Sequence, residues 1–204
     1  MKDVEKGFRG PQLIVSRGCK EFIEELFKAE VPEMESGAVE IKAIAREAGV
    51  RSKIAVASNV PGVDPVGTFV GGHGTRINAV RDEIGNQEMI DIIVWDEDLA
   101  TFIANAMKPA NVVRVQIGKE GKAAVVVAED QLSIAIGKSG QNVRLAGKLT
   151  GHELDVEADK AGTNQKSQSE PETEAVESKP VVQKLKKKTE LENSLLEAIE
   201  EHGE

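Results

Sequence analysis

Residues 132–151 read LSIAIGKSGQNVRLAGKLTG, and this stretch decides how the rest of the chain is interpreted. A short apolar segment runs into the glycine loop GKSG at residues 137–140. The next ten residues keep helical spacing of apolar side chains and stop at Gly151, a residue type that commonly ends helices. The stretch therefore predicts a glycine loop between two helices.

The same order of elements occurs twice in the chain, and the earlier loop is GGHG at residues 71–74. Each copy is predicted to run helix, strand, strand, short helix, glycine loop, longer helix, strand. In the first copy we expect a helix at 20–31, strands at 38–46 and 52–57, a short helix capped by Asp64, a helix ending at Gly85 and a strand at 89–95. In the second we expect a helix at 99–107, strands at 112–117 and 122–128, a short helix capped by Asp130 and a last strand at 153–156.

This order is that of a type II KH domain, so the predicted class is α+β with two tandem type II KH domains. The expected divisions are a remnant barrel strand at 1–17, a first KH domain at 18–97, a second at 98–158 and a disordered tail at 159–204. The segment GPQLIVSR (residues 10–17) is expected to form a lone strand. In the tail, a short helix beginning at Thr189 is possible.

A glycine loop ahead of a helix suits binding of a sugar-phosphate backbone. Glycine has no Cβ, so the backbone of a nucleic acid can approach closely, and the helix start presents N–H groups and a positive dipole end. A single GxxG is usually only a tight turn. Two of them in the same setting favour RNA binding. A nucleotide-binding enzyme is disfavoured, because Leu132 stands where a P-loop needs glycine and Ile77 breaks the dinucleotide-binding spacing.

The composition restricts how RNA would be held. The net charge is −9 and aromatic residues make up 3% of the chain, which disfavours both a purely electrostatic grip and an aromatic stacking platform. The single cysteine, Cys19, excludes an internal disulfide and is expected to be a small buried or half-buried residue rather than a nucleophile. We expect no metal, no cofactor and no membrane segment, and a monomer that is not an enzyme.

The candidate RNA-binding residues lie in and just after the two loops. We expect the second loop to contribute more, because Lys138 is a cation where His73 of the first loop is mostly neutral. For Arg76 and Arg144, a solvated helix face is an open alternative. Arg51 and Lys53 are expected on the plain surface, and Trp95 between the domains. The full set is Gly71, Gly72, His73, Gly74, Arg76, Gly137, Lys138, Ser139, Gly140, Gln141, Asn142 and Arg144.

Several long segments also resemble the tandem KH region of the bacterial NusA family: VEIKAIAREAGVRSKIAVAS (39–58), DPVGTFVG (64–71), IDIIVWDED (90–98) and residues 132–151. The resemblance implies a cytoplasmic transcription factor that holds nascent single-stranded RNA and modulates pausing, termination and antitermination. It also implies contact with RNA polymerase, through domains not found in this sequence or through the tail. His73 departs from the basic residue common in the family's first loop.

Two alternatives remain open from the sequence. One is another tandem KH protein, acting in ribosome function or RNA processing, which association with ribosomes instead of polymerase would distinguish. The other is a protein-interaction module without RNA binding, for which changes at Lys138 and Ser139 would have no effect.

Overall fold

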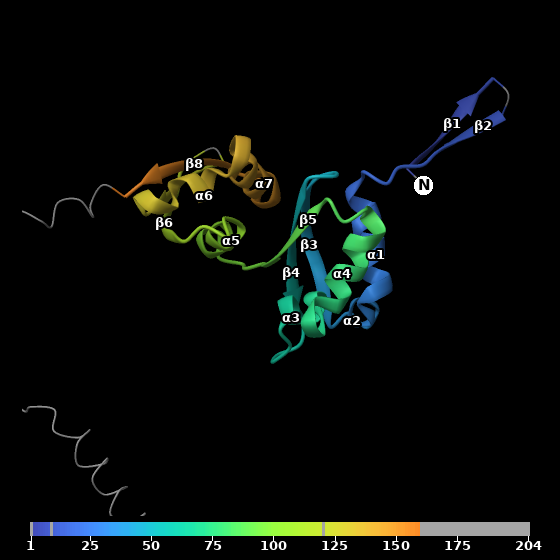
Figure 1. Ribbon diagram of the computed structural model, residues 1–204, viewed down its shortest axis with the longest axis horizontal. Helices are drawn as coiled ribbons and strands as arrows, with labels where there is room; N and C mark the ends of the chain where they lie inside the picture. Colours follow the sequence, from blue (N-terminus) through green and yellow to red (C-terminus); the bar gives the residue numbers. More distant parts are fainter. Residues whose placement is uncertain (1, 9, 120, 160–204) are drawn as a thin grey trace, which may run out of the picture. The chain divides into compact units, whose positions relative to one another are not determined.

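The computed structural model describes residues 2–8, 10–119 and 121–159, whose helices and strands are drawn in Figure 1. The predicted linker and terminal helix of the tail lie outside the described residues. Within the described part of the chain, no helix is long and apolar enough to cross a membrane.

The first copy of the repeat forms the predicted elements in the predicted order. Its three-stranded sheet has the order β3-β4-β5, with β3 antiparallel and β5 parallel to the central β4. Helices α1 and α4 lie on one face of this sheet (Figure 1). The elements are α1 (Lys20–Glu30), α2 (Pro32–Glu35), β3 (Val39–Glu47), β4 (Arg51–Ser58), α3 (Pro65–Val70), a 3₁₀ turn (Gly72–Gly74), α4 (Thr75–Ile84) and β5 (Met89–Val94).

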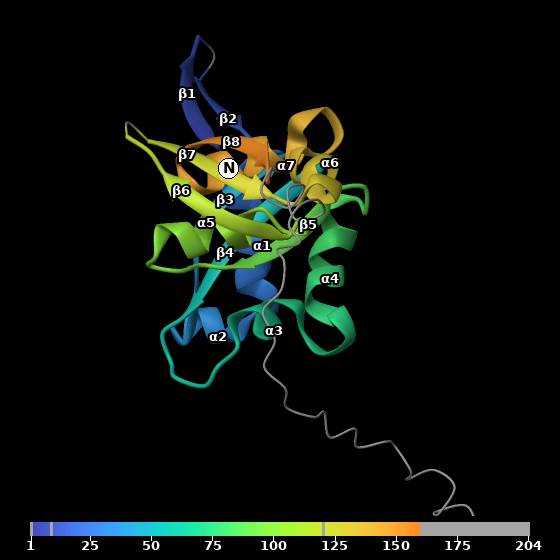
Figure 2. The same ribbon diagram turned by 90° about the vertical axis from the view of Figure 1, so that its left-hand side faces the viewer.

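The second copy repeats this topology. Strands β6, β7 and β8 form a sheet in that order, again with an antiparallel and a parallel pairing, and Figure 2 shows the three strands together. The elements are α5 (Leu99–Ala106), β6 (Val112–Ile117), β7 (Lys122–Val127), a 3₁₀ turn (Glu129–Gln131), α6 (Leu132–Ile136), a second 3₁₀ turn (Lys138–Gly140), α7 (Gln141–Thr150) and β8 (Glu153–Ala158). The α+β class with two tandem KH domains is therefore confirmed.

The N-terminal strand differs from the prediction, because it has a partner. Strand β2 (Gly10–Ile14) pairs antiparallel with β1 (Asp3–Gly7) to form a two-stranded hairpin. The prediction of a strand without a partner was wrong, because the polar residues of β1 show no alternating pattern typical of a strand.

The predicted helix ends are confirmed in three of four places. The Asp64 carboxylate accepts a hydrogen bond from the Val66 N–H at 3.0 Å and so caps α3. Gly85 and Gly151 end α4 and α7 in the left-handed conformation. The prediction that Asp130 caps the short helix was wrong. This residue lies inside the 3₁₀ turn before α6, where its carboxylate accepts from the Gln131 side chain instead.

Strand β4 is covered on both faces, which explains why residues 52–57 are all buried. Ile54 and Val56 belong to the core beneath the helices of the first domain. Ala55 belongs to a second core that also contains residues of α5 and α7. On β3 a bulge after Ile41 resets the alternation, so that Ala43 and Ala45 also face this second core. Small alanine side chains thus let the second domain pack directly on the first domain's sheet.

Candidate RNA interface

The two glycine loops have the same backbone conformation. The first residue of each, Gly71 or Gly137, has φ of 75° or 74° and ψ of 167° or 174°. The third, His73 or Ser139, has φ of 53° in both loops, and the fourth is again a left-handed glycine. The middle two residues of both loops are exposed. Each loop therefore presents its two central residues and their peptide groups to solvent in the same backbone conformation.

The first glycine of each loop is required by space as well as by backbone angle. A Cβ on Gly71 would lie 2.9 Å from the Arg76 Cγ, and a Cβ on Gly137 would lie 2.8 Å from the Asn142 Cβ. Both residues also have a combination of φ and ψ that is essentially restricted to glycine. The loop closes tightly onto the second residue of the following helix.

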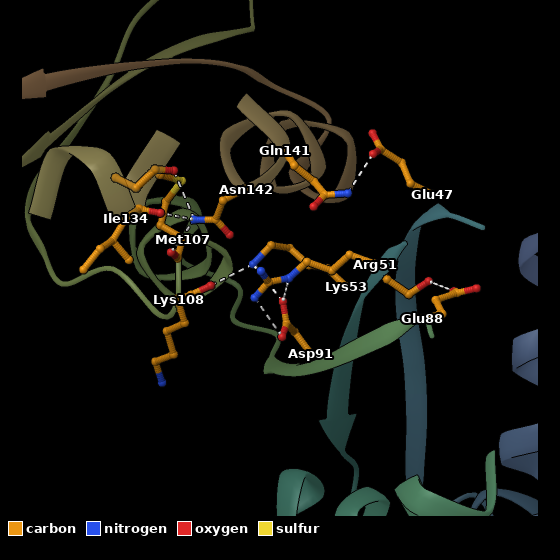
Figure 3. A network of polar contacts seen from close by, with 12 residues as sticks. Glu47, Arg51, Lys53, Glu88, Asp91, Met107, Lys108, Ile134, Gln141 and Asn142 are labelled. Carbon is orange, nitrogen blue, oxygen red and sulfur yellow. Dashed lines mark hydrogen bonds and ion pairs between the residues drawn. The ribbon is translucent and has the colours of Figure 1, made fainter. Parts of the chain in front are cut away.

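That second helical residue braces each loop. The Arg76 guanidinium donates to the Thr68 carbonyl at 2.8 Å, and the Asn142 amide donates at 3.5 Å to the carbonyl of Ile134, the corresponding position. Asn142 also donates to the Ala135 and Met107 carbonyls, at 3.1 and 3.0 Å. Figure 3 shows the Asn142 side chain directed at these groups. Asn142 is only 2% exposed, so it supports the loop from inside.

Arg76 is held from a second side. Its guanidinium makes two hydrogen bonds of 3.0 Å with the two carboxylate oxygens of Glu33 on α2. These hydrogen bonds lower the pKa of Glu33. The first loop is thus braced by a charged pair that lies entirely within its own domain.

The second loop is held by a residue of the first domain. The carboxylate of Glu47, the last residue of β3, accepts hydrogen bonds from Arg144 and Gln141 on α7. The hydrogen bonds from Arg144, and then from Gln141, lower the pKa of Glu47 to about 2. No local sequence pattern indicates this contact, because Gln141 and Arg144 lie 94 and 97 residues after Glu47.

Lys53 is buried between the domains, so its expected surface position was wrong. Its side chain is fully buried, and its ammonium group donates to the Lys108 carbonyl at 2.8 Å and lies 3.4 Å from the Asp91 carboxylate (Figure 3). Burial lowers the pKa of Lys53 to about 8, although Asp91 opposes this shift. Arg51 is half-buried and paired with Asp91 at 2.7 Å, so it is not plain surface either.

Several other expectations can be placed in the structure. Trp95 packs against the core shared by the two domains, as predicted, and the Lys42 ammonium group lies 4.9 Å from the centre of its ring. Cys19 is half-buried, as predicted. Among the residues described, no group of three His, Cys, Asp or Glu side chains is arranged to hold a metal ion.

Comparisons with known proteins agree with this architecture. The family model described as the NusA-like first KH domain matches residues 17–95, and the one described as the NusA-like second KH domain matches residues 99–164. Fold and loops together define the class, which is that of tandem type II KH proteins. KH domains typically bind single-stranded nucleic acid at the glycine loop.

Curated relatives give the particular family. The chain is 51% identical over 158 residues to the transcription termination/antitermination protein NusA of Thermus thermophilus, a match that covers 77% of this chain and 41% of the relative. It is 49% identical over 157 residues to the NusA of Bacillus subtilis, a match that covers 76% of this chain and 42% of the relative. The region from residue 17 to residue 164 belongs to the NusA family of tandem KH domains. The chain spans about two fifths of the length of these relatives.

Proposed function

We propose that this chain binds single-stranded RNA through both glycine loops, and that it serves as the RNA-holding part of a transcription termination and antitermination factor. The observation that carries the proposal is the repeated loop: two GxxG turns with the same backbone, each with its two central residues exposed. Family membership supports the same function, since the curated relatives are named for transcription termination and antitermination.

The loops supply donors for phosphate without a basic surface. Helices α4 and α7 each begin at a loop glycine, and neither start receives a side-chain cap. The first N–H groups of such a helix suit a phosphate oxygen, and the helix dipole adds favourable charge. Lys138 adds a mobile cation at the second position of the second loop, where the first loop has Gly72. A chain with net charge −9 can hold RNA in this way.

The bases would rest on aliphatic surface beside the second loop. Ile134 and Ile136 on α6 are 43% and 38% exposed, although isoleucine is usually buried. The corresponding residues of the first domain are Thr68 and the half-buried Val70. The second loop thus has more apolar surface for unstacked bases, which supports the larger role proposed for it.

The proposed phosphate-contacting set is the four residues of each loop, with Gln141 at the edge of the second. We propose that the protein acts as a monomer in the bacterial cytoplasm, as a binding protein and not as an enzyme. Contact with RNA polymerase is proposed to run through segments outside the KH pair. The domain boundaries proposed are those of the sequence analysis, with residues 1–17 as part of a preceding barrel.

The test is binding of a fluorescent single-stranded RNA of about ten nucleotides at several salt concentrations. The variant Lys138→Asp/Ser139→Asp places negative charge where the phosphate is proposed to lie, and we expect it to lose binding while its thermal unfolding stays cooperative. The variant Lys119→Asp/Lys122→Gln makes the same net charge change at two exposed residues, one in the turn after β6 and one at the start of β7, and should retain most of the affinity. Equal binding by wild type and loop variant, or no binding by the wild type, would refute the proposal.

A further inference from the structure

Glu47 is placed by strand geometry to reach the second domain. Residues of β3 after the bulge alternate, so Glu47 shares a face with Ala43 and Ala45, which belong to the core shared with α7. Its side chain is 21% exposed, so it lies at the border of this interface. The last residue of a first-domain strand therefore meets the start of the second domain's loop helix.

The carboxylate of Glu47 engages two side chains near that helix start, Gln141 and Arg144. One carboxylate oxygen accepts from the Arg144 Nε at 2.7 Å, and the other accepts from the Arg144 Nη2 and from the Gln141 amide, each at 3.0 Å. Lys148 lies farther away, with its Nζ 3.9 Å from Glu47. Figure 3 shows the Gln141 side chain directed toward Glu47.

Arg144 connects this carboxylate to the loop itself. Its remaining terminal nitrogen, Nη1, donates to the carbonyl of Ser139, the third residue of the loop, at 3.2 Å. The guanidinium therefore uses Nε and both terminal nitrogens for contacts within the protein, although its side chain is 47% exposed. Its hydrogen bonds with Glu47 raise the pKa of Arg144, so the group remains a cation.

A carboxylate and a phosphate compete for the same guanidinium. Both accept two parallel N–H···O bonds from the planar fork, and Glu47 already holds that fork. The negative charge of Glu47 also lies beside Gln141, the first residue of α7, where an RNA phosphate is proposed to approach. Glu47 thus weakens attraction for RNA in two ways: it neutralises a nearby cation, and it adds a nearby anion.

We propose that Glu47 is an internal counter-anion that keeps Arg144 from RNA and so sets the affinity of the second loop below its capacity. This inference rests on the proposed function, since it concerns the same RNA site. Its consequence is that the first domain tunes the strength of the second domain's loop. A moderate affinity suits a protein that must release a moving transcript.

The decisive variant is Glu47→Gln, which keeps the shape and removes the charge. We expect RNA to bind about threefold to tenfold more tightly, because Arg144 becomes available to one more phosphate. For the same reason, the slope of log affinity against log salt should become steeper by about 0.7. A purely structural role would not change this slope in that direction.

The matched control is Glu40→Gln, which removes the same charge from the same strand. Glu40 pairs with Lys42 at 2.7 Å, and about 23 Å of extended strand separates it from Glu47. We expect its RNA affinity to stay within about twofold of wild type. Glu47→Asp keeps the charge but shortens the side chain by one methylene, and it should give a gain in RNA affinity between those of wild type and Glu47→Gln. This variant replaces Glu47→Gln in the test if Glu47→Gln does not fold.

A double-variant cycle ties the gain to Arg144. Adding Arg144→Gln to the Glu47→Gln variant should remove the gain in affinity and restore the wild-type salt slope. In the wild-type protein, where Glu47 is present, Arg144→Gln should lower RNA affinity by a smaller factor than it does in the Glu47→Gln variant. The inference is overturned if Glu47→Gln weakens binding, or if it behaves like Glu40→Gln. Failure of the proposed function is a separate outcome, in which Lys138→Asp/Ser139→Asp binds RNA as well as wild type.

Discussion

The two glycine loops share one backbone conformation but are supported in different ways. The first is braced within its own domain, by Arg76 and its partner Glu33. The second is braced by the buried, uncharged Asn142 and by Glu47 of the other domain. The comparison teaches that a repeated motif can keep its geometry while its support moves from a local charge pair to an interface.

The largest effect is expected at the first glycine of the second loop. Gly137→Ala would place a Cβ against Asn142, a buried residue that cannot move aside, and we expect a loss of about 4 kcal/mol in the free energy of unfolding. Gly71→Ala should cost less, since its Cβ would meet the Cγ of Arg76, whose half-buried side chain has more room to shift than the fully buried Asn142. Gly140→Ala meets no atom within 4 Å and should cost only about 1 kcal/mol. Urea unfolding measures all three, and equal losses would contradict the proposed rigidity of the second loop.

The braces themselves give the next comparison. Asn142→Ala leaves buried carbonyls without a donor, and we expect it to destabilise the protein by about 3 kcal/mol. Arg76→Ala removes a half-exposed brace and should cost about 1 kcal/mol. Thermal unfolding of both variants checks the difference. A larger loss from Arg76→Ala would mean that the charge pair is the stronger support.

The free energy of unfolding should depend on pH through Lys53, which is buried in the interface between the two domains. Because the pKa of Lys53 in the folded chain, about 8, is below its ordinary value, the unfolded chain binds more protons between pH 8 and about 10.5. Stability should therefore rise with pH in this window, by about 2 kcal/mol between pH 8 and pH 10, and the same amount is lost as the pH falls from 10 to 8.

The measurement compares wild type with Lys53→Met, which has no group to titrate at this position. The difference in free energy of unfolding between the two proteins should change with pH by the amount given above. A constant difference would show that Lys53 keeps an ordinary pKa despite its burial.

The smallest effect is expected when the first loop is made to resemble the second. Gly72→Lys adds a cation at the position that Lys138 holds in the second loop, where an added Cβ would meet no atom within 4 Å, and should tighten RNA binding by about threefold, with a salt slope steeper by about 0.7. Fluorescence anisotropy at several salt concentrations detects this change. No gain would indicate that RNA passes the first loop without a phosphate contact at residue 72.

Most of the fold could be predicted from the sequence, because the glycine loops and the apolar periodicity recur in one order. The order of elements, the helix ends at Gly85 and Gly151, and the cap at Asp64 follow from local rules. The cap at Asp130 failed because the turn before α6 is a 3₁₀ turn, whose residues give no distinct signal.

The supports of the loops could not be predicted in the same way. Lys53 was expected at the surface because lysine is seldom fully buried, and its burial follows from packing of the second domain on β4. A signal was present in the alanines around it, which leave room for a helix on that face. Glu47 had no such signal, since its role depends on contacts about a hundred residues away.

The packing of the second domain on the first domain's sheet is a contact that a further domain of this kind would have to repeat. The first domain's sheet receives the second domain's helix, a head-to-tail contact that does not close on itself and could in principle continue. The corresponding sheet of the second domain exposes Glu153, Asp155 and Glu157 along β8, so a further copy docking there would strip water from three carboxylates. The second domain thus exposes a row of carboxylates on β8, whereas the first domain's sheet offers alanines to the helix that packs on it.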